Sequence, residues 1–238
     1  MEKIVDTEPA ASAASTAKCA KPRGRPLSFD RERALEQAMH VFWQRGYEAA
    51  SVAELTAAMG ITAPSLYTAF GDKEHLFLEA IERYVSGPGA GFPLALEEEP
   101  TAYLAIRRLL MEAAEELTRP CHPKGCMVTM AATNCSEASA RIQEALAKRR
   151  QAGDKGIRCR IECGMSRGEL PADTDAQMLA DFYGTVFRGM SMQAADGATR
   201  ESLTATAEAA MRAWPGDVAK AKPAAKAAVK KTRKTAAA

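Results

Sequence analysis

The sequence predicts an all-α protein. Ala, Leu, Glu, Arg and Met, which favour helices, dominate its composition, and no convincing alternating run of β-branched residues indicates a strand. Helix caps and helix-period apolar stripes recur along the chain. With 238 residues, 47% of them hydrophobic, the chain can form one large or two small domains with a substantial core. No apolar run approaches the roughly 18 residues of a membrane span, so we expect no membrane partner.

The first stretch, residues 1–28, is rich in Ala, Ser and Thr and lacks periodicity, which predicts a disordered basic arm. Its residues 21–26 read KPRGRP and resemble the core of an AT-hook. An extended Arg-Gly-Arg can enter a narrow minor groove, so we expect Arg23 and Arg25 to contact DNA. The alternative, a charge cluster that only improves solubility, remains open.

Three short helices are expected next. The first runs from about Asp30 to Gln44 and stops at Gly46. The second begins with a capping box, because Ser51 can accept from the backbone N–H of Glu54 and Glu54 can reach back. Gly60 ends it by adopting positive φ. The apolar stripe of this second helix is Val52, Leu55 and Met59.

The third helix, from Thr62 to Phe70, has two different faces. Thr62 can cap it, and Pro64 is tolerated in its first turn. Leu66, Ala69 and Phe70 should point inward. The residues expected to point outward are Pro64, Ser65, Tyr67 and Thr68. A tight turn followed by a helix with a small, polar and aromatic outer face is typical of a helix-turn-helix that enters the major groove of DNA.

Residues 60–76, which read GITAPSLYTAFGDKEHL, resemble the recognition helix and following helix start of the tetracycline-repressor-like (TetR/AcrR) family of transcriptional regulators. The likeness extends upstream through FWQRGY at residues 42–47 and downstream to about Tyr84. It implies a helix-turn-helix head, a larger helical body that binds an effector and dimerises, and a double-stranded DNA operator as partner.

The outer face of the head can be assigned contacts. Hydroxyl groups can reach phosphates and base edges, and Ala63 and Pro64 can touch a thymine methyl. Family members often have Lys and Gly at those two positions, so the operator sequence stays open. The resemblance implies a phosphate contact for Lys73, and first-turn amides near Ser51 can hold another phosphate. The DNA-binding candidates are Arg23, Arg25, Ser51, Thr62, Ala63, Pro64, Ser65, Tyr67, Thr68 and Lys73.

The rest of the chain predicts further helices. Asp72 should cap a helix whose stripe is Leu76, Phe77, Ala80, Ile81 and Tyr84. Residues 86–93 are expected to form a loop. Helices are then expected over about 101–119, 127–135, 136–167, 174–195 and 199–214. The 136–167 helix contains Gly153 and Gly156, where an irregularity is possible.

The helix over 174–195 carries more apolar surface than one face of a monomer needs. Gly184, Gly189 and Ser191 would also permit close helix approach. The family's last two long helices pair with their copies in a second subunit, so the resemblance implies a homodimer with an isologous interface. The alternative is that these residues only complete the monomer core.

The sensor is less well defined by the sequence. We expect a small, largely apolar organic effector inside the body. Met and aromatic side chains make adaptable pockets, and the candidate liners are Met127, Met130, Met165, Phe182 and Tyr183. Each of these could equally be ordinary core.

Six cysteines in a chain without an export signal are expected to be reduced thiols. Cys126, Cys159 and Cys163 are candidates for redox sensing, with simple packing as the alternative. No cysteine spacing matches a standard structural-zinc pattern, so we expect no metal and no cofactor.

Charge is divided unevenly along the chain. Lys220–Lys234 carries seven basic residues and no acid, whereas residues 31–219 hold 20 basic and 26 acidic residues. The expected organisation is a disordered basic arm at 1–28, a helix-turn-helix domain at 29–86, an effector-binding and dimerisation domain at 96–215, and a disordered basic tail at 216–238. Basic ends on an acidic body suit binding to a polyanion.

The predicted function is a homodimeric, ligand-responsive transcriptional repressor that a small organic effector releases from its operator. No serine-hydrolase elbow, P-loop or paired-carboxylate motif appears, so we do not expect an enzyme. We expect a cytoplasmic location, because no apolar signal-peptide core is present. Two alternatives remain: a thiol- or metal-responsive regulator on the same fold, or a non-specific nucleoid-type DNA-binding protein.

Overall fold

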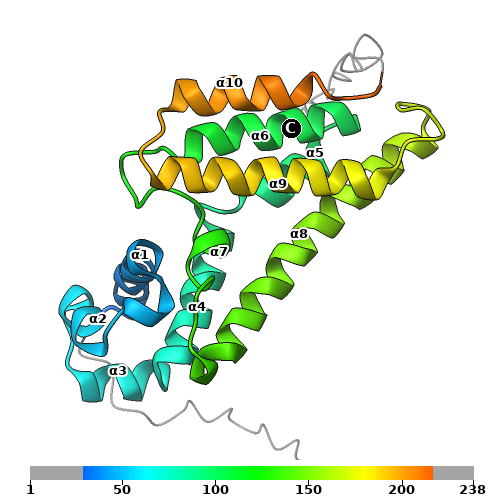
Figure 1. Cartoon of the computed structure of the whole chain (residues 1–238). Helices are drawn as coiled ribbons and strands as arrows, with labels where there is room; N and C mark the ends of the chain where they lie inside the picture. The colour runs from blue at the N-terminus through cyan, green and yellow to red at the C-terminus, as the bar shows by residue number, and fades with distance from the viewer. Residues whose placement is uncertain (1–28, 217–238) are drawn as a thin grey trace, which may run out of the picture.

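A computed structural model describes residues 29–216, and the regular elements in that range are all helices (Figure 1). The helices α1–α3 form a small head, α4 leads away from it, and α5–α10 form the larger body. None of the helices in residues 29–216 has the length and apolar character needed to cross a membrane. The arm at 1–28 and residues 217–238 of the tail, with the predictions made for them, lie outside the described residues.

The head follows from short-range signals in its sequence. Helix α1 (Arg31–Ala49) is interrupted at Gly46, whose φ of 76° is outside the helical range, so the expected stop is confirmed. Helices α2 (Val52–Met59) and α3 (Ala63–Phe70) complete the head. Its core contains fully or nearly fully buried side chains from all of these helices and from α4: Phe42, Leu55, Leu66, Phe70 and Phe77.

Helix α4 (Lys73–Ser86) connects head and body. Asp72 caps it by accepting from the backbone N–H of His75. Every member of its predicted apolar stripe, from Leu76 to Tyr84, is buried. Because α4 packs against both α1 and α7 (Met127–Met130), any shift of the body can be passed to the head through it.

Helix α5 (Gly91–Glu98) corrects the expectation of a loop through residue 93. Pro93 falls in the first turn of α5, where a missing N–H costs no intrahelical hydrogen bond. Two glycines of α8 (Ala140–Ser166) make room for it. A Cβ at Gly153 would lie 3.4 Å from Phe92, and one at Gly156 would lie 3.3 Å from Leu96.

The remaining body helices are α6 (Ala102–Glu116), α9 (Ala176–Ala195) and α10 (Arg200–Met211), which lie side by side, while the long α8 runs obliquely from the head towards α9 (Figure 1). A short 3-10 helix, η1 (Glu137–Ser139), precedes α8, so the expected helix over 136–167 starts later than predicted. No break in α8 occurs at its glycines.

Helix α7 is also shorter than the expected helix over 127–135, because it ends at Met130. In a longer helix the carbonyl of Ala131 would accept from the residue four positions on. It accepts instead from the backbone N–H of Tyr47 in the head, at 2.7 Å. The interaction with the head therefore replaces the next turn of α7.

Candidate nucleic-acid interface and effector cavity

The turn between α2 and α3 is fixed by caps on both sides. Ser51 and Glu54 form the complete capping box, with both hydrogen bonds at 3.1 Å. Gly60 has φ 66° and donates to the carbonyls of Ala57 and Thr56. Thr62 caps α3 by accepting from the N–H of Ser65. These local hydrogen bonds set the direction in which α3 leaves the turn.

The outward face of α3 carries the side chains expected there. Pro64, Tyr67 and Thr68 are exposed, and the exposed fraction of Tyr67 is 49%. Ser65 is only half-buried and its hydroxyl lies 3.0 Å from that of Thr62. About half of the Tyr67 side chain is therefore open to solvent and available to contact another molecule.

Arg31 holds the end of α3 in place. Its guanidinium lies 2.7 Å from a carboxylate oxygen of Glu79 and donates to the carbonyl of Ala69 at 3.3 Å. It also stacks over the ring of Phe70, 4.4 Å from the centroid. One side chain of α1 therefore ties α3 to α4.

Lys73 lies at the first turn of α4, beside the head. Its Nζ is 4.5 Å from the centroid of the Tyr47 ring and donates to the Glu48 carbonyl at 3.4 Å. Burial lowers the pKa of Lys73, and Glu48 acts in the opposite direction. The amine is therefore oriented by α1 before any phosphate arrives.

A joint between head and body lies on the other side of α1. The indole of Trp43 stacks on His122 with centroids 4.4 Å apart, and its Nε1 donates to the Gly125 carbonyl at 2.9 Å. His122 Nε2 lies 2.9 Å from a carboxylate oxygen of Glu116 in α6. One further buried contact continues the joint: Cys126 N donates to Ser191 Oγ of α9 at 2.8 Å. The segment before α7 thus connects the head to α6 and α9.

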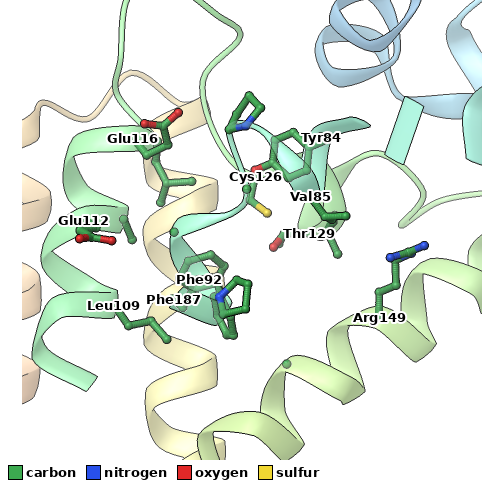
Figure 2. Close-up of a pocket in the computed structure, with 18 of the residues that line it drawn as sticks. Tyr84, Val85, Phe92, Leu109, Glu112, Glu116, Cys126, Thr129, Arg149 and Phe187 are labelled. Carbon is green, nitrogen blue, oxygen red and sulfur yellow. The ribbon is translucent and has the colours of Figure 1, made fainter. Parts of the chain in front are cut away.

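A cavity of about 1440 Å³ lies against this joint. Residues of α1, α4, α5, α6, α7, α8 and α9 line it, together with the segment before α7. In Figure 2, Glu112, Glu116 and Leu109 face it from α6, and Arg149 extends from α8 on the opposite side. The cavity reaches solvent, since exposed residues such as Cys121 and Cys159 lie on its wall. Its volume exceeds the roughly 300–1,000 Å³ of typical small-molecule sites.

None of the five expected pocket residues lines this cavity. Met127 is fully buried in the core, and Tyr183 is buried against Trp214 with centroids 5.9 Å apart. Phe182 is 40% exposed on the outer face of α9. Met130 and Met165 also lie off the wall. The sequence could not separate these roles, because Met and aromatic residues at helical spacing look alike in a core, a pocket and an interface.

The three thiol candidates do line the cavity, and Cys121 joins them. Cys126 is buried and Cys163 half-buried, while Cys159 is exposed; all are free thiols. Burial raises the pKa of Tyr84, and the neighbouring Cys126 adds to that rise. Residues 29–216 contain no group of three side chains arranged to hold a metal ion.

Sequence reasoning missed the aromatic pair of the cavity, Phe92 and Phe187, whose rings meet edge to face at 5.1 Å. It also missed Arg150 and His122. A possible signal was the pair of glycines in α8, because they allow a neighbouring helix to come close.

The fold and its two sites define a class of protein: a regulator with a capped helix-turn-helix head and a helical body that encloses a cavity. The profile described as "Bacterial regulatory proteins, tetR family" matches residues 34–80, and "Tetracyclin repressor-like, C-terminal domain" matches residues 104–210. The chain belongs to the TetR family of DNA-binding transcriptional regulators.

Two curated relatives are HTH-type transcriptional repressors of Escherichia coli (strain K12). ComR is 36% identical over 82% of this chain and 93% of its own length. BdcR is 32% identical over 81% of this chain and 92% of its own length. A solved structure of a cysteine mutant of the TetR family transcriptional regulator CifR, complexed with 26-bp double-strand operator DNA, has 45% identity and a TM-score of 0.78. It is matched over 81% of this chain and 100% of that chain. These relatives are transcriptional regulators, not enzymes.

Proposed function

We propose that this protein is a homodimeric repressor that binds a double-stranded operator through α3 and leaves it when a small organic effector enters the cavity. The observation that carries the proposal is the position of the cavity. Its wall includes Tyr84, His122 and Cys126, which also belong to the joint with the head. A ligand there contacts the elements that orient the recognition helix.

The outer face of the head supplies the DNA contacts in this proposal. Tyr67, Thr68, Thr62 and Ser65 offer hydroxyls, and Ala63 and Pro64 offer apolar contacts to thymine methyl groups. The amides near Ser51 and the amine of Lys73 serve as phosphate contacts. Arg23 and Arg25, which lie outside the described residues, add minor-groove contacts.

The homodimer is supported by an apolar face on α9. Met178, Phe182 and Met192 are 64%, 40% and 52% exposed, and a Cβ added at Gly189 would meet nothing within 4 Å. These four positions recur at helical spacing. Large apolar side chains gathered on one exposed face mark an association surface. Two copies joined through α9 and α10 would present two heads to a palindromic operator.

Release from DNA requires that the effector prefer one state of the body over the other. Because α1 of the head, α4 and the segment before α7 all line the cavity, a small displacement at the cavity wall changes the separation of the two α3 helices. A pair of recognition helices must match major grooves about 34–36 Å apart, or a multiple of that spacing. Loss of that match lowers operator affinity.

The test uses the full-length protein and a DNA duplex from the intergenic region beside its gene. Fluorescence anisotropy at physiological salt should give an affinity for the operator duplex at least about 10³-fold higher than for random duplex. Tyr67→Ala should lower operator affinity while leaving the melting temperature close to wild type. Leu94→Ala is a matched control, since Leu94 is 40% exposed but lies on α5 in the body. Equal affinity for both duplexes would favour a non-specific DNA-binding protein.

A thiol-responsive regulator is a second candidate, because Cys126, Cys159 and Cys163 all lie on the cavity wall. In this mode hydrogen peroxide, and not a bound organic molecule, releases the operator. Single Cys→Ser variants separate the two modes. Release by peroxide that disappears in one variant would support the thiol mode, and release that survives in all three would remove it.

A further inference from the structure

The charged groups on the cavity wall are almost all paired. Asp154 lies 2.8 and 3.0 Å from Nη1 of Arg188, and Gly184 leaves the space for this pair, since a Cβ there would be 2.4 Å from Asp154. Glu112 pairs with Arg108 at 2.7 Å, and Glu116 pairs with Arg119 at 2.8 Å and contacts His122. The remaining pairs on the wall are Arg83 with Glu36, Arg149 with Glu82, and Glu115 with Arg119 and Arg200.

Arg150 is different from these residues. It lines the cavity, and no carboxylate in residues 29–216 lies within 4 Å of its guanidinium. Within the described part of the chain, its one hydrogen bond runs from Nη1 to the Val128 carbonyl, at 2.9 Å. A guanidinium has five N–H donors, so most of them remain for another partner. Burial lowers the pKa of Arg150 and the Arg188 guanidinium lowers it further, while Cys126 and Asp154 act in the opposite direction.

A second arginine of the wall adds to the positive character of α8. Arg160 donates through Nη2 to the Glu99 carbonyl at 2.8 Å, and its buried Nε has no hydrogen-bond partner in the described residues. On the acidic side only Glu97 lacks a partner in the described chain, and Glu97 is exposed to water. The unpaired charge that is partly withdrawn from solvent is therefore cationic.

One part of the wall is apolar. Phe92 and Phe187 form the aromatic pair, and Leu109 and Leu96 lie beside them on the wall. A ligand that matches this wall has an anionic end for α8 and an apolar end for the aromatic pair. Carboxylate fits the fork of a guanidinium and forms charge-assisted hydrogen bonds with it.

We propose that the effector of this cavity is an organic anion, an amphiphile whose carboxylate binds Arg150 and whose apolar part lies against Phe92 and Phe187. The inference rests on the proposed function, because it names the ligand class of the cavity assigned there. A cationic or neutral amphiphile would leave Arg150 unpaired, and a cation would also be repelled by it.

The same contact gives a route to the head. A carboxylate that binds the free donors of Arg150 and draws the guanidinium into the cavity lengthens its hydrogen bond to the Val128 carbonyl of α7. Helix α7 ends at the Ala131 carbonyl that accepts from Tyr47, and it follows the Gly125 carbonyl that accepts from Trp43. Loss of the Arg150–Val128 hydrogen bond therefore loosens the segment that holds the head.

The experiment is isothermal titration of the full-length protein with three probes of one chain length: octanoate, octanamide and octylamine. Octanoate should bind at least about tenfold more tightly than octanamide, as a charge-assisted hydrogen bond predicts, and octylamine should bind most weakly. Arg150→Met should lower octanoate affinity to that of octanamide without changing octanamide binding, and Arg150→Lys should restore part of the preference. Arg158→Met, on the same helix but off the cavity wall, should bind all three probes as wild type does.

Equal affinity for octanoate and octanamide would overturn the inference, as would an unchanged preference in Arg150→Met or no octanoate binding at about 1 mM. A parallel operator-release assay separates this inference from the proposed function. Octanoate that binds through Arg150 but leaves the operator complex intact supports the ligand class and contradicts ligand-released repression. If octanamide or octylamine releases the operator as efficiently as octanoate does, the result supports ligand-released repression and contradicts the organic anion as the ligand class.

Discussion

The indole Nε1 of Trp43 donates to the carbonyl oxygen of Gly125 at 2.9 Å, across 82 positions of the chain. Both partners are buried, so the carbonyl has no water to replace the donor. Trp43 also meets Tyr84 edge to face at 4.7 Å. A single residue of α1 thus contacts α4, His122 and the segment before α7, and so joins the head to the body.

Trp43→Phe keeps a large ring but removes the donor. We expect the free energy of unfolding to fall by about 1–3 kcal/mol, the cost of leaving a buried carbonyl unpaired. Denaturant unfolding at one fixed protein concentration measures it, because dimerisation would otherwise change the apparent stability. Trp214→Phe is the control, since Trp214 is equally buried but donates no hydrogen bond in the described residues. An equal loss in both variants would mean that the hydrogen bond adds nothing beyond packing.

The elements that could be predicted from the sequence are those specified by neighbouring residues. Ser51, Gly60, Thr62 and Asp72 fix the ends of α2, α3 and α4 through contacts no more than four positions away. The exposure of Tyr67 followed from the same periodicity. These signals need no information about the rest of the chain.

What the sequence did not reveal depends on contacts between distant segments. Helix α5 was missed because glycines at 87, 89 and 91 indicate a loop, whereas its support comes from Gly153 and Gly156 of α8. The length of α7 depends on Tyr47, and the cavity wall depends on seven helices meeting. Phe182 and Phe187 differ by five positions on one helix, yet the first faces outward and the second faces the cavity.

Gly125 and Gly168 test the rigidity of the joint as a matched pair. Both have positive φ, 83° and 73°, but a Cβ at Gly125 would lie 2.8 Å from Met130 Sδ and 3.0 Å from the Ser191 carbonyl, whereas one at Gly168 would meet nothing within 4 Å. Gly168→Ala should cost about 1–2 kcal/mol of backbone strain, or several degrees in melting temperature. Gly125→Ala should lose at least twice as much. Similar melting temperatures for the two variants would show that the crowded segment relaxes freely.

Acid should destabilise the head through its capping carboxylates. Hydrogen bonds from the backbone and side chain of His75 lower the pKa of Asp72, and hydrogen bonds from Ser51 lower that of Glu54. A carboxyl whose pKa is lower when folded stabilises the protein above its unfolded pKa and loses that contribution as pH falls through the folded pKa. The free energy of unfolding should therefore fall as pH drops from about 5 to about 3.

Asp72→Asn isolates one of these groups. The Asn side chain can still accept from the His75 N–H, but it does not titrate. Urea unfolding at several pH values should give a shallower acid dependence for this variant than for wild type. Asp173→Asn removes an exposed carboxylate that caps no helix and serves as the control. Identical acid slopes in wild type and Asp72→Asn would show that this cap does not contribute to the pH dependence.

The apolar face of α9 should decide the assembly state. Phe182 lies between Met178 and Gly189 on that face. In an isologous interface each substitution appears in both subunits, close to the two-fold axis or facing the partner's copy of α9. Phe182→Asp would bury two carboxylates among Met side chains without a cationic partner, which is costly. We expect wild type to sediment as a dimer and Phe182→Asp as a folded monomer. Operator affinity should fall as well, because a single head contacts one half-site and loses the advantage of linked binding.

Leu94→Asp places the same charge on an equally exposed apolar position of α5 and should leave the dimer intact. A Phe182→Asp protein that remains dimeric would move the interface away from α9, and a monomeric variant with full operator affinity would contradict binding of the operator by paired heads.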